Sequence, residues 1–204
     1  MNRHRLEWVK EKIAMRRSAW IFALLILIGG KAYGQPKAVD PAGSVTIINS
    51  KGEPVGSATL TQGPQSVTIA LEVSQLPPGK HGLHIHAIGK CDPPDFQTAG
   101  GHFNPFRKMH GLKNPEGPHA GDLPNLEVGP DGKGKIEATI GGLTLGKEGL
   151  AVLFNPDGTA VVIHAGPDDE MTDPAGNSGA RIACGVIKPT GAAALPSKPV
   201  KEGS

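Results

Sequence analysis

The chain has 204 residues with 21 basic and 19 acidic side chains, a balance that gives no support to nucleic-acid binding. Its length suits one domain with extensions. The two cysteines are far apart and form no Cys-x-x-Cys motif, which excludes that kind of metal or redox site.

The first residues predict an export signal. Residues 19–28 are continuously apolar, and this run is too short to span a bilayer, which needs about 20 residues. Arg16 and Arg17 precede the run and small residues follow it, which is the order of a secretory signal peptide. We expect cleavage after Gly34, with residues 1–34 as the signal and an uncleaved anchor as the alternative. The protein is therefore expected to be exported, to a periplasm or to the medium.

Removal of the signal changes the charge of the chain. The first 34 residues hold seven basic and two acidic side chains, which leaves 14 basic and 17 acidic side chains after cleavage. The excess of positive charge belongs to the targeting segment. We therefore expect no nucleic-acid partner, and no stable membrane association once the signal is removed.

After residue 40 the sequence alternates apolar and polar residues in short segments, which indicates β-strands rather than helices. Turn signals such as Pro130-Asp131-Gly132 and Pro156-Asp157-Gly158 separate these segments. The predicted strands are residues 44–49, 57–61, 66–73, 81–87, 135–140, 150–155, 159–164 and 181–187. This pattern favours an all-β fold, an eight-stranded antiparallel Greek-key β-barrel or sandwich.

Two long stretches, residues 90–127 and residues 165–180, interrupt the strands. Loops longer than about 15 residues without secondary structure are uncommon and are usually functional. We expect residues 35–42 to be a short linker and residues 43–188 to be the folded domain. Residues 189–204 are rich in Ala, Pro, Lys and Gly, and we expect a disordered tail there.

Cys91 and Cys184 are the two cysteines of the chain. In an exported protein an isolated pair of this kind predicts one disulfide. A bridge closing so long a loop would contribute roughly 4–5 kcal/mol in the chain-entropy model. Two free buried thiols are the alternative.

Seven of the eight histidines lie between His81 and His164. His84 and His86 are two residues apart, so on a strand their side chains would point to the same face and could bind one metal ion. Three histidines and one aspartate suit zinc, whereas histidines alone suit a copper ion that changes its oxidation state. The candidate donors suffice for two four-coordinate metals if one imidazole serves both: His84, His86, His102, His110, His119, Asp122 and His164.

The histidines belong to longer motifs that are spread over nearly the whole predicted domain. These motifs are His81-Gly-Leu-His-Ile-His86, Gly100-Gly-His-Phe-Asn-Pro105, His119-Ala-Gly-Asp-Leu123, Val162-Ile-His164 and the segment from Gly176 to Ile187. Their combination resembles the Cu/Zn superoxide dismutase family, in the form found in exported bacterial proteins.

The resemblance implies a division of the donors between two metals. The copper ligands would be His84, His86, His102 and His164. The zinc ligands would be His102, His110, His119 and Asp122, with the imidazole of His102 bridging the two metals.

Other residues match further parts of the family pattern. Asp168 would link a copper-ligand histidine to a zinc-ligand histidine from outside the coordination sphere. His81 would be a structural residue beneath the copper strand. The resemblance also implies the disulfide between Cys91 and Cys184, and it places Arg181 at the mouth of the copper site.

The implied activity is that of an oxidoreductase, a superoxide dismutase with a role in antioxidant defence. Superoxide would be converted to oxygen and hydrogen peroxide by alternate reduction and reoxidation of the copper ion, with zinc in a structural role. Arg181 would pair with the superoxide anion and His102 would supply a proton. A homodimer is a possible assembly.

Two departures from the family pattern are visible. Leu83 replaces a phenylalanine, and residues 165–180 carry four acids and no lysine, which argues against attraction of superoxide by this stretch. Three alternatives remain at this point: a metal-binding or chaperone module on the same fold, a copper-only dismutase, and a structural sandwich with incidental histidines.

Overall fold

The computed structural model describes residues 42–190. Within this range the strand pairs are antiparallel, which confirms the predicted all-β antiparallel class. The elements are β1 (Ala42–Asn49), β2 (Pro54–Gln62), β3 (Ser66–Val73), β4 (Gly79–His81), β5 (Leu83–His86), a 3-10 helix η1 (Gln97–Ala99), β6 (Leu126–Val128), β7 (Gly134–Gly141), β8 (Ala160–His164), β9 (Arg181–Val186) and β10 (Lys188–Thr190).

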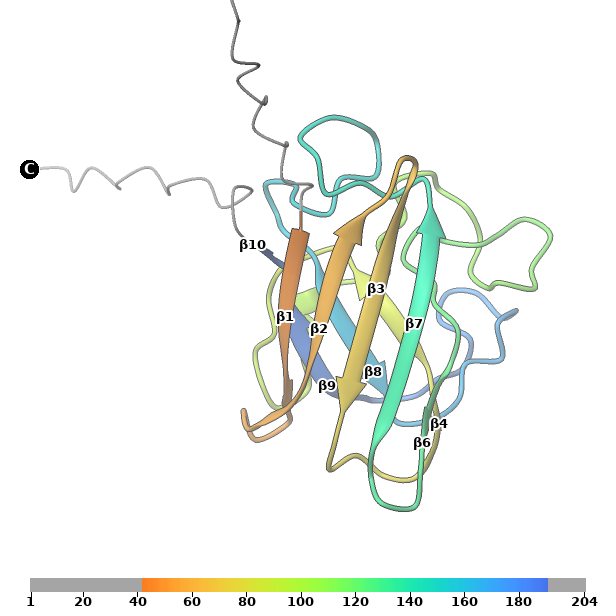
Figure 1. The fold of residues 1–204 in the computed structure, drawn as a ribbon. Coiled ribbons are helices and arrows are strands. Elements are labelled where there is room, and N and C mark those ends of the chain that lie inside the picture. The colour runs from red at the N-terminus through yellow and green to blue at the C-terminus, as the bar shows by residue number, and fades with distance from the viewer. Residues whose placement is uncertain (1–41, 191–204) are drawn as a thin grey trace, which may run out of the picture. The chain divides into compact units, whose positions relative to one another are not determined.

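The strands form one sheet in the order β4-β6-β7-β3-β2-β1-β9-β8-β5, and β10 pairs with β1. The strands at the two ends of this path, β4 and β5, are separated in the sequence by Gly82 alone, so the sheet curls into a nearly closed barrel. Figure 1 shows β1, β2, β3 and β7 as one layer in front of β8 and β9. Neighbours that are distant in sequence, such as β3 with β7 and β1 with β9, give the crossed connections of a Greek key.

In the front layer, buried apolar side chains alternate with more exposed ones, so that one face of the layer packs on the core. In β3, Val67, Ile69 and Leu71 are buried in the core, while the residues between them are more exposed. In contrast, β5 and β8 are buried along their whole length. One face of these two strands packs on the main core and the other face is covered by loops, so both faces are shielded from water.

The two loops that cover this outer face hold most of the predicted site. We call residues 87–125 the histidine loop and residues 165–180 the acidic loop. The disulfide between Cys91 and Cys184 ties the histidine loop to β9, with 5.6 Å between the Cα atoms, as predicted. Beside it lies a small apolar cluster in which Phe96 packs with Val162 on the outer face of β8.

The number of strands differs from the prediction. The predicted strand 81–87 divides at Gly82 into β4 and β5, which pair with β6 and β8 respectively. The sequence does not predict β6, which lies at the end of the expected loop 90–127, or β10. Each of these strands has only three residues, which is too short for alternation to stand out.

The predicted strand at residues 150–155 is wrong. Within it only Val152 makes a β-bridge, an isolated one with Thr144. Ala151 and Leu153 are buried in the main core and Leu150 is exposed, so the apolar residues here serve packing of a loop and not strand pairing.

The boundaries of the domain also shift. Ala42, the last residue of the expected linker, begins β1, and the first two residues of the expected tail complete β10 by pairing with β1. The expected signal peptide and the rest of the linker and tail lie outside the described residues. Among the residues that the structure describes, no helix is long and apolar enough to cross a bilayer.

Candidate metal centre

Three histidines share the outer face of two neighbouring strands. In the pairing of β5 with β8, His84 lies opposite Val162 and His86 lies opposite Ala160. His164 is the last residue of β8, and residues 160, 162 and 164 point to the same side because alternate strand residues share a face. The sheet register therefore brings the rings of His84, His86 and His164 together outside the core.

The histidine loop adds a fourth ring by docking on the edge of β5. The backbone N–H of Phe103 donates to the carbonyl oxygen of Ile85 at 2.8 Å, and His102 forms an isolated bridge with His86. The ring centroid of His102 lies 4.0 Å from that of His84 and 5.0 Å from that of His86.

Each of these four rings has one buried nitrogen with no hydrogen-bond partner. Such atoms are rare in folded proteins, and a role in binding an ion is one of their ordinary causes. Ligand atoms of the four residues lie within 4.8 Å of one another. The unpartnered atoms are His84 Nδ1, His86 Nε2, His102 Nε2 and His164 Nε2.

The opposite nitrogens of the three strand histidines are held in place. His84 Nε2 donates to Asp168 Oδ2 at 2.7 Å. Backbone carbonyls accept from the other two rings, at 2.8 Å from His86 Nδ1 to Gly100 O and 3.0 Å from His164 Nδ1 to Gly179 O. These hydrogen bonds place the proton on the outer nitrogen, so the inner nitrogen keeps its lone pair for a metal.

Burial keeps these imidazoles neutral. It lowers the pKa of His84 to about 3, that of His86 to about 2 and that of His164 to about 4. Burial also lowers the pKa of His102. Because a metal binds the neutral imidazole, the site is ready to bind cations at neutral pH.

A second group of donors surrounds one carboxylate oxygen. Asp122 Oδ1 lies 3.0 Å from His102 Nδ1, 3.0 Å from His110 Nδ1 and 3.4 Å from His119 Nδ1. The other carboxylate oxygen, Oδ2, accepts from the backbone N–H groups of Gly111 and His119, both at 2.9 Å. Three imidazoles and one carboxylate in this arrangement suit a four-coordinate zinc ion.

Asp122 is ionised in this setting. Burial by itself opposes its ionisation, but hydrogen bonds from His102, His119 and the Gly111 N–H outweigh burial, and the pKa of the carboxyl lies well below its usual range. A carboxylate that stays charged at neutral pH fits a cation site.

His84 also lies near this second group, and a set of four donors within 4.8 Å can be drawn with His84 in place of His119. However, Asp168 occupies Nε2 of His84, and Nδ1 of His84 is one of the unpartnered atoms of the first group. His119 is therefore the better fourth donor beside His102, His110 and Asp122.

Asp168, on the acidic loop, contacts both groups. Its Oδ2 accepts from His84, and its Oδ1 accepts from His110 Nε2 at 3.0 Å. Burial favours the neutral carboxyl, but the hydrogen bonds from these two rings outweigh it and lower the pKa to about 2. The side chain of Asn125 fixes the backbone of Asp168 on both sides, at 2.7 Å to its N–H and 2.8 Å to its carbonyl oxygen.

Arg181 begins β9, opposite His164 in the sheet register. Its guanidinium donates to the carbonyl oxygens of Phe96 and Gly100, both at 2.7 Å. Gly100 O is also the acceptor for His86, so the cation is held beside the first donor group. Its partial burial leaves part of the side chain accessible.

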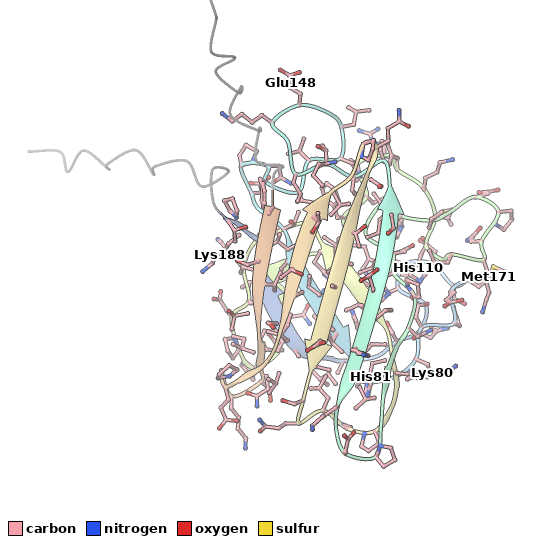
Figure 2. The ribbon with its side chains drawn as sticks, in the orientation of Figure 1. Lys80, His81, His110, Glu148, Met171 and Lys188 are labelled. Atoms are coloured by element: carbon pink, nitrogen blue, oxygen red, sulfur yellow. A yellow bond between two sulfur atoms is a disulfide. The ribbon has the colours of Figure 1, made fainter. Side chains whose placement is uncertain are left out.

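His81 is buried apart from both groups. Its Nδ1 lies 2.7 Å from the carbonyl oxygen of His164, and its Nε2 lies 2.8 Å from that of Pro77. Both ring nitrogens are therefore used to connect backbone segments, in agreement with the expected structural role. Figure 2 labels His81 near the base of the barrel and His110 higher up, inward of Met171 on the acidic loop.

Apart from Asp168, the sequence interpretation missed the residues that hold the histidines in place. Asn125 follows Asp122 by three residues and could have been noticed as a polar residue close to the motif. The carbonyl groups of Gly100 and Gly179 carry no signal in the sequence, because any residue has such a group.

Comparison with known proteins shows the family of the chain. The family model described as copper/zinc superoxide dismutase (SODC) matches residues 55–187. The chain belongs to the copper/zinc superoxide dismutase family. It is 55% identical over 143 residues to superoxide dismutase [Cu-Zn] 1 of Aquifex aeolicus, covering 70% of this chain and 85% of that protein.

Two further proteins are similar to the chain over most of their own length. Superoxide dismutase [Cu-Zn] 2 of Aquifex aeolicus is 43% identical over 175 residues, which cover 85% of this chain and all of that protein. The crystal structure of a superoxide dismutase-like protein from Bacillus subtilis superposes with a TM-score of 0.69 at 43% identity, covering 71% of this chain and 97% of that chain.

Proposed function

We infer that this protein is a superoxide dismutase that uses copper and zinc to convert superoxide to oxygen and hydrogen peroxide. Two superoxide anions and two protons give one molecule of each product. The observation that carries the inference is the convergence of four buried imidazole nitrogens that have no partner, in a chain of the copper/zinc superoxide dismutase family.

We propose that copper binds the inward nitrogens of the first group and zinc binds the second. The copper residues are His84, His86, His102 and His164. The zinc residues are His102, His110, His119 and Asp122. A redox metal suits the set made of histidines alone, and zinc suits the set that includes a carboxylate.

When bound, copper supplies the one-electron oxidation and reduction that the reaction needs. His102 has one nitrogen directed at each group of donors. Its Nε2 is the atom on the copper side, so we propose that this nitrogen takes up a proton from water when the metal would be reduced and gives that proton to the departing peroxide, which leaves the nitrogen unprotonated again. The carboxylate of Asp122, 3.0 Å from Nδ1, keeps the ring in the orientation that this transfer requires.

Arg181 binds the substrate in this proposal. Its positive charge persists although burial lowers its pKa, because an arginine remains protonated across the physiological range. The two backbone carbonyls that accept from it hold the guanidinium in one place. A superoxide anion that approaches the copper residues would therefore meet a fixed cation.

Metal analysis combined with an activity assay tests the proposed function. The exported protein would be purified, its copper and zinc per chain measured, and its superoxide consumption followed with and without a copper chelator. We expect both metals to be bound, and we expect the activity to disappear when the chelator removes copper. Full loading with both metals and no consumption of superoxide would overturn the proposal.

We also propose that the protein is exported and acts in a periplasm or outside the cell. The disulfide between Cys91 and Cys184 supports this, because disulfides persist in oxidising compartments. The predicted signal would direct export and would be cleaved, as expected after Gly34, so that no stable membrane association would remain. Native mass spectrometry of the exported form measures the cleavage site and tests the possible homodimer.

A further inference from the structure

The acidic loop places a second carboxylate against the proposed zinc residues. Asp173 Oδ1 accepts from the backbone N–H of His110 at 2.7 Å. The same oxygen lies 3.6 Å from Nε2 of His119. Asp173 thus lies close to two of the proposed zinc residues: it accepts a hydrogen bond from the backbone of His110 and faces the ring of His119.

Its position resembles that of Asp168 on the same loop. Nδ1 of His110 is directed at Asp122, and its Nε2 meets Asp168. Nδ1 of His119 is directed at Asp122 in the same way, and its Nε2 faces Asp173. Each of these two histidines therefore has a carboxylate of the acidic loop behind its outer nitrogen.

The strength of the contact follows from its geometry. A separation of 3.6 Å is too long for a direct hydrogen bond, so the attraction between Asp173 and the ring of His119 is electrostatic. The His119 side chain is 7% exposed and that of Asp173 is 37% exposed, so water screens the attraction in part. The hydrogen bond to the His110 N–H is short and adds to the effect.

We propose that Asp173 is a positioning residue for zinc, which orients His110 through its backbone and supports His119 through the charge on its carboxylate. A metal-bound imidazole carries a partial positive charge, and an anion behind its outer nitrogen stabilises that state. The inference rests on the proposed assignment of zinc to His110, His119 and Asp122.

Three substitutions separate the two contributions. Asp173→Asn keeps an oxygen for the His110 N–H but removes the charge. Asp173→Ala removes both, and Asp173→Glu restores the charge on a longer side chain. Asp169→Asn is the matched control, because Asp169 lies on the same loop but accepts from Met171, Thr172 and Asn177 and not from a histidine.

Zinc affinity of the mature, copper-loaded protein would be measured by competition with a zinc chelator. Loss of an outer partner typically weakens metal binding about 10–100-fold, and partial exposure places Asp173→Asn near the lower end, at about tenfold. We expect Asp173→Ala to bind zinc more weakly still. Asp173→Glu should recover part of the loss, and Asp169→Asn should match the unaltered protein.

Cobalt(II) substituted for zinc gives a spectroscopic readout of the ligands. A change in its visible absorption with Asp173→Asn, absent with Asp169→Asn, would support the role. Unchanged zinc affinity in Asp173→Asn and Asp173→Ala, or an equal loss in the Asp169→Asn control, would overturn it. Failure of the proposed dismutation would appear separately, as an unaltered protein that holds both metals and consumes no superoxide.

Discussion

Each strand histidine of the proposed copper group uses one ring nitrogen to fix its orientation and leaves the other without a partner. The acceptors are a carboxylate for His84 and backbone carbonyls for His86 and His164. Rotation of a ring would break its hydrogen bond inside a buried site, which is costly. The donors are therefore arranged before any metal arrives.

Arg181 is expected to affect the rate of dismutation and not the binding of copper. Arg181→Ala removes the cation beside the copper residues but none of the proposed ligands, so dismutation should slow on the order of tenfold or more while copper content stays constant. Superoxide consumption and copper per chain would be measured on the same sample. Loss of copper in the variant would show that Arg181 instead maintains the ligands, through the Gly100 carbonyl that it shares with His86.

Asp122 tests the division of the ligands. Asp122→Ala removes the one carboxylate of the proposed zinc set, and we expect zinc affinity to fall by more than the roughly 10–100-fold typical of an outer partner. Copper should remain bound, because the copper residues include no carboxylate. Equal loss of both metals, measured by elemental analysis, would contradict the proposed division.

Among the elements, β5 combines three duties. It supplies His84 and His86, it packs Leu83 and Ile85 into the core, and it forms one end of the sheet. Its free edge is not left open, because the histidine loop bonds to both backbone groups of Ile85: Phe103 N–H donates to its carbonyl oxygen and its N–H donates to Gly121 O, at 2.8 Å each. An open strand edge invites pairing with other chains, and here the loop that carries four of the proposed metal ligands prevents it.

Gly121 makes this close approach possible. A Cβ atom at Gly121 would clash with the carbonyl oxygen of Ile85, whereas one at Gly141 would meet nothing within 4 Å. Gly121→Ala should therefore destabilise the protein by about 1–3 kcal/mol through overpacking and weaken zinc binding by displacing Asp122. Denaturant unfolding would be compared with that of the control Gly141→Ala, and equal effects of the two substitutions would contradict this explanation.

The elements also show how far the sequence could be interpreted. Long alternating strands such as β3 were predicted within their bounds, because Val67, Ile69 and Leu71 repeat with a period of two. The division of the predicted strand 81–87 at Gly82 was not predicted. Both halves have a strand-like sequence, and they differ only in the strands with which they pair, β6 for β4 and β8 for β5. Residues 150–155 were wrongly predicted as a strand, because the apolar residues of a packed loop resemble those of a strand.

For the site, the sequence predicted the donors better than their supports. The histidines and Asp122 were found by residue type and motif, and the structure brings them into two adjoining groups. Asp173 was noticed only as one of several acids on residues 165–180. Its contact with His110 and His119 depends on how two loops meet, and no local pattern encodes that.

At the scale of the whole molecule, the buried histidines make the stability of the metal-free protein depend on pH. In the unfolded chain a histidine has its ordinary pKa of 6.5, whereas in the fold the values for His84, His86 and His164 are about 3, 2 and 4. Between pH 6.5 and 4 the unfolded state therefore binds more protons, and the free energy of unfolding falls as the pH falls.

Each of these groups contributes at most about 1.4 kcal/mol per pH unit. We expect the urea midpoint of the metal-free protein to decrease steadily from pH 7 to pH 4. The lowered pKa values of Asp122 and Asp168 continue the trend below pH 4, because those carboxylates must then be protonated. A midpoint that stayed constant between pH 6.5 and 4 would contradict the burial of neutral histidines.

Along β5, alternate residues serve different purposes: one set packs the core of the fold and the other set supplies the proposed metal ligands. Leu83 and Ile85 belong to the interior of the barrel, and His84 and His86 belong to its outer face. A mutation of a histidine codon therefore leaves the packing of the interior unchanged, and a mutation of an apolar codon leaves the donor set unchanged. A lineage could lose or regain the metals many times while the barrel persisted, so retention of the fold is weak evidence of activity and retention of the outward-facing residues is strong evidence.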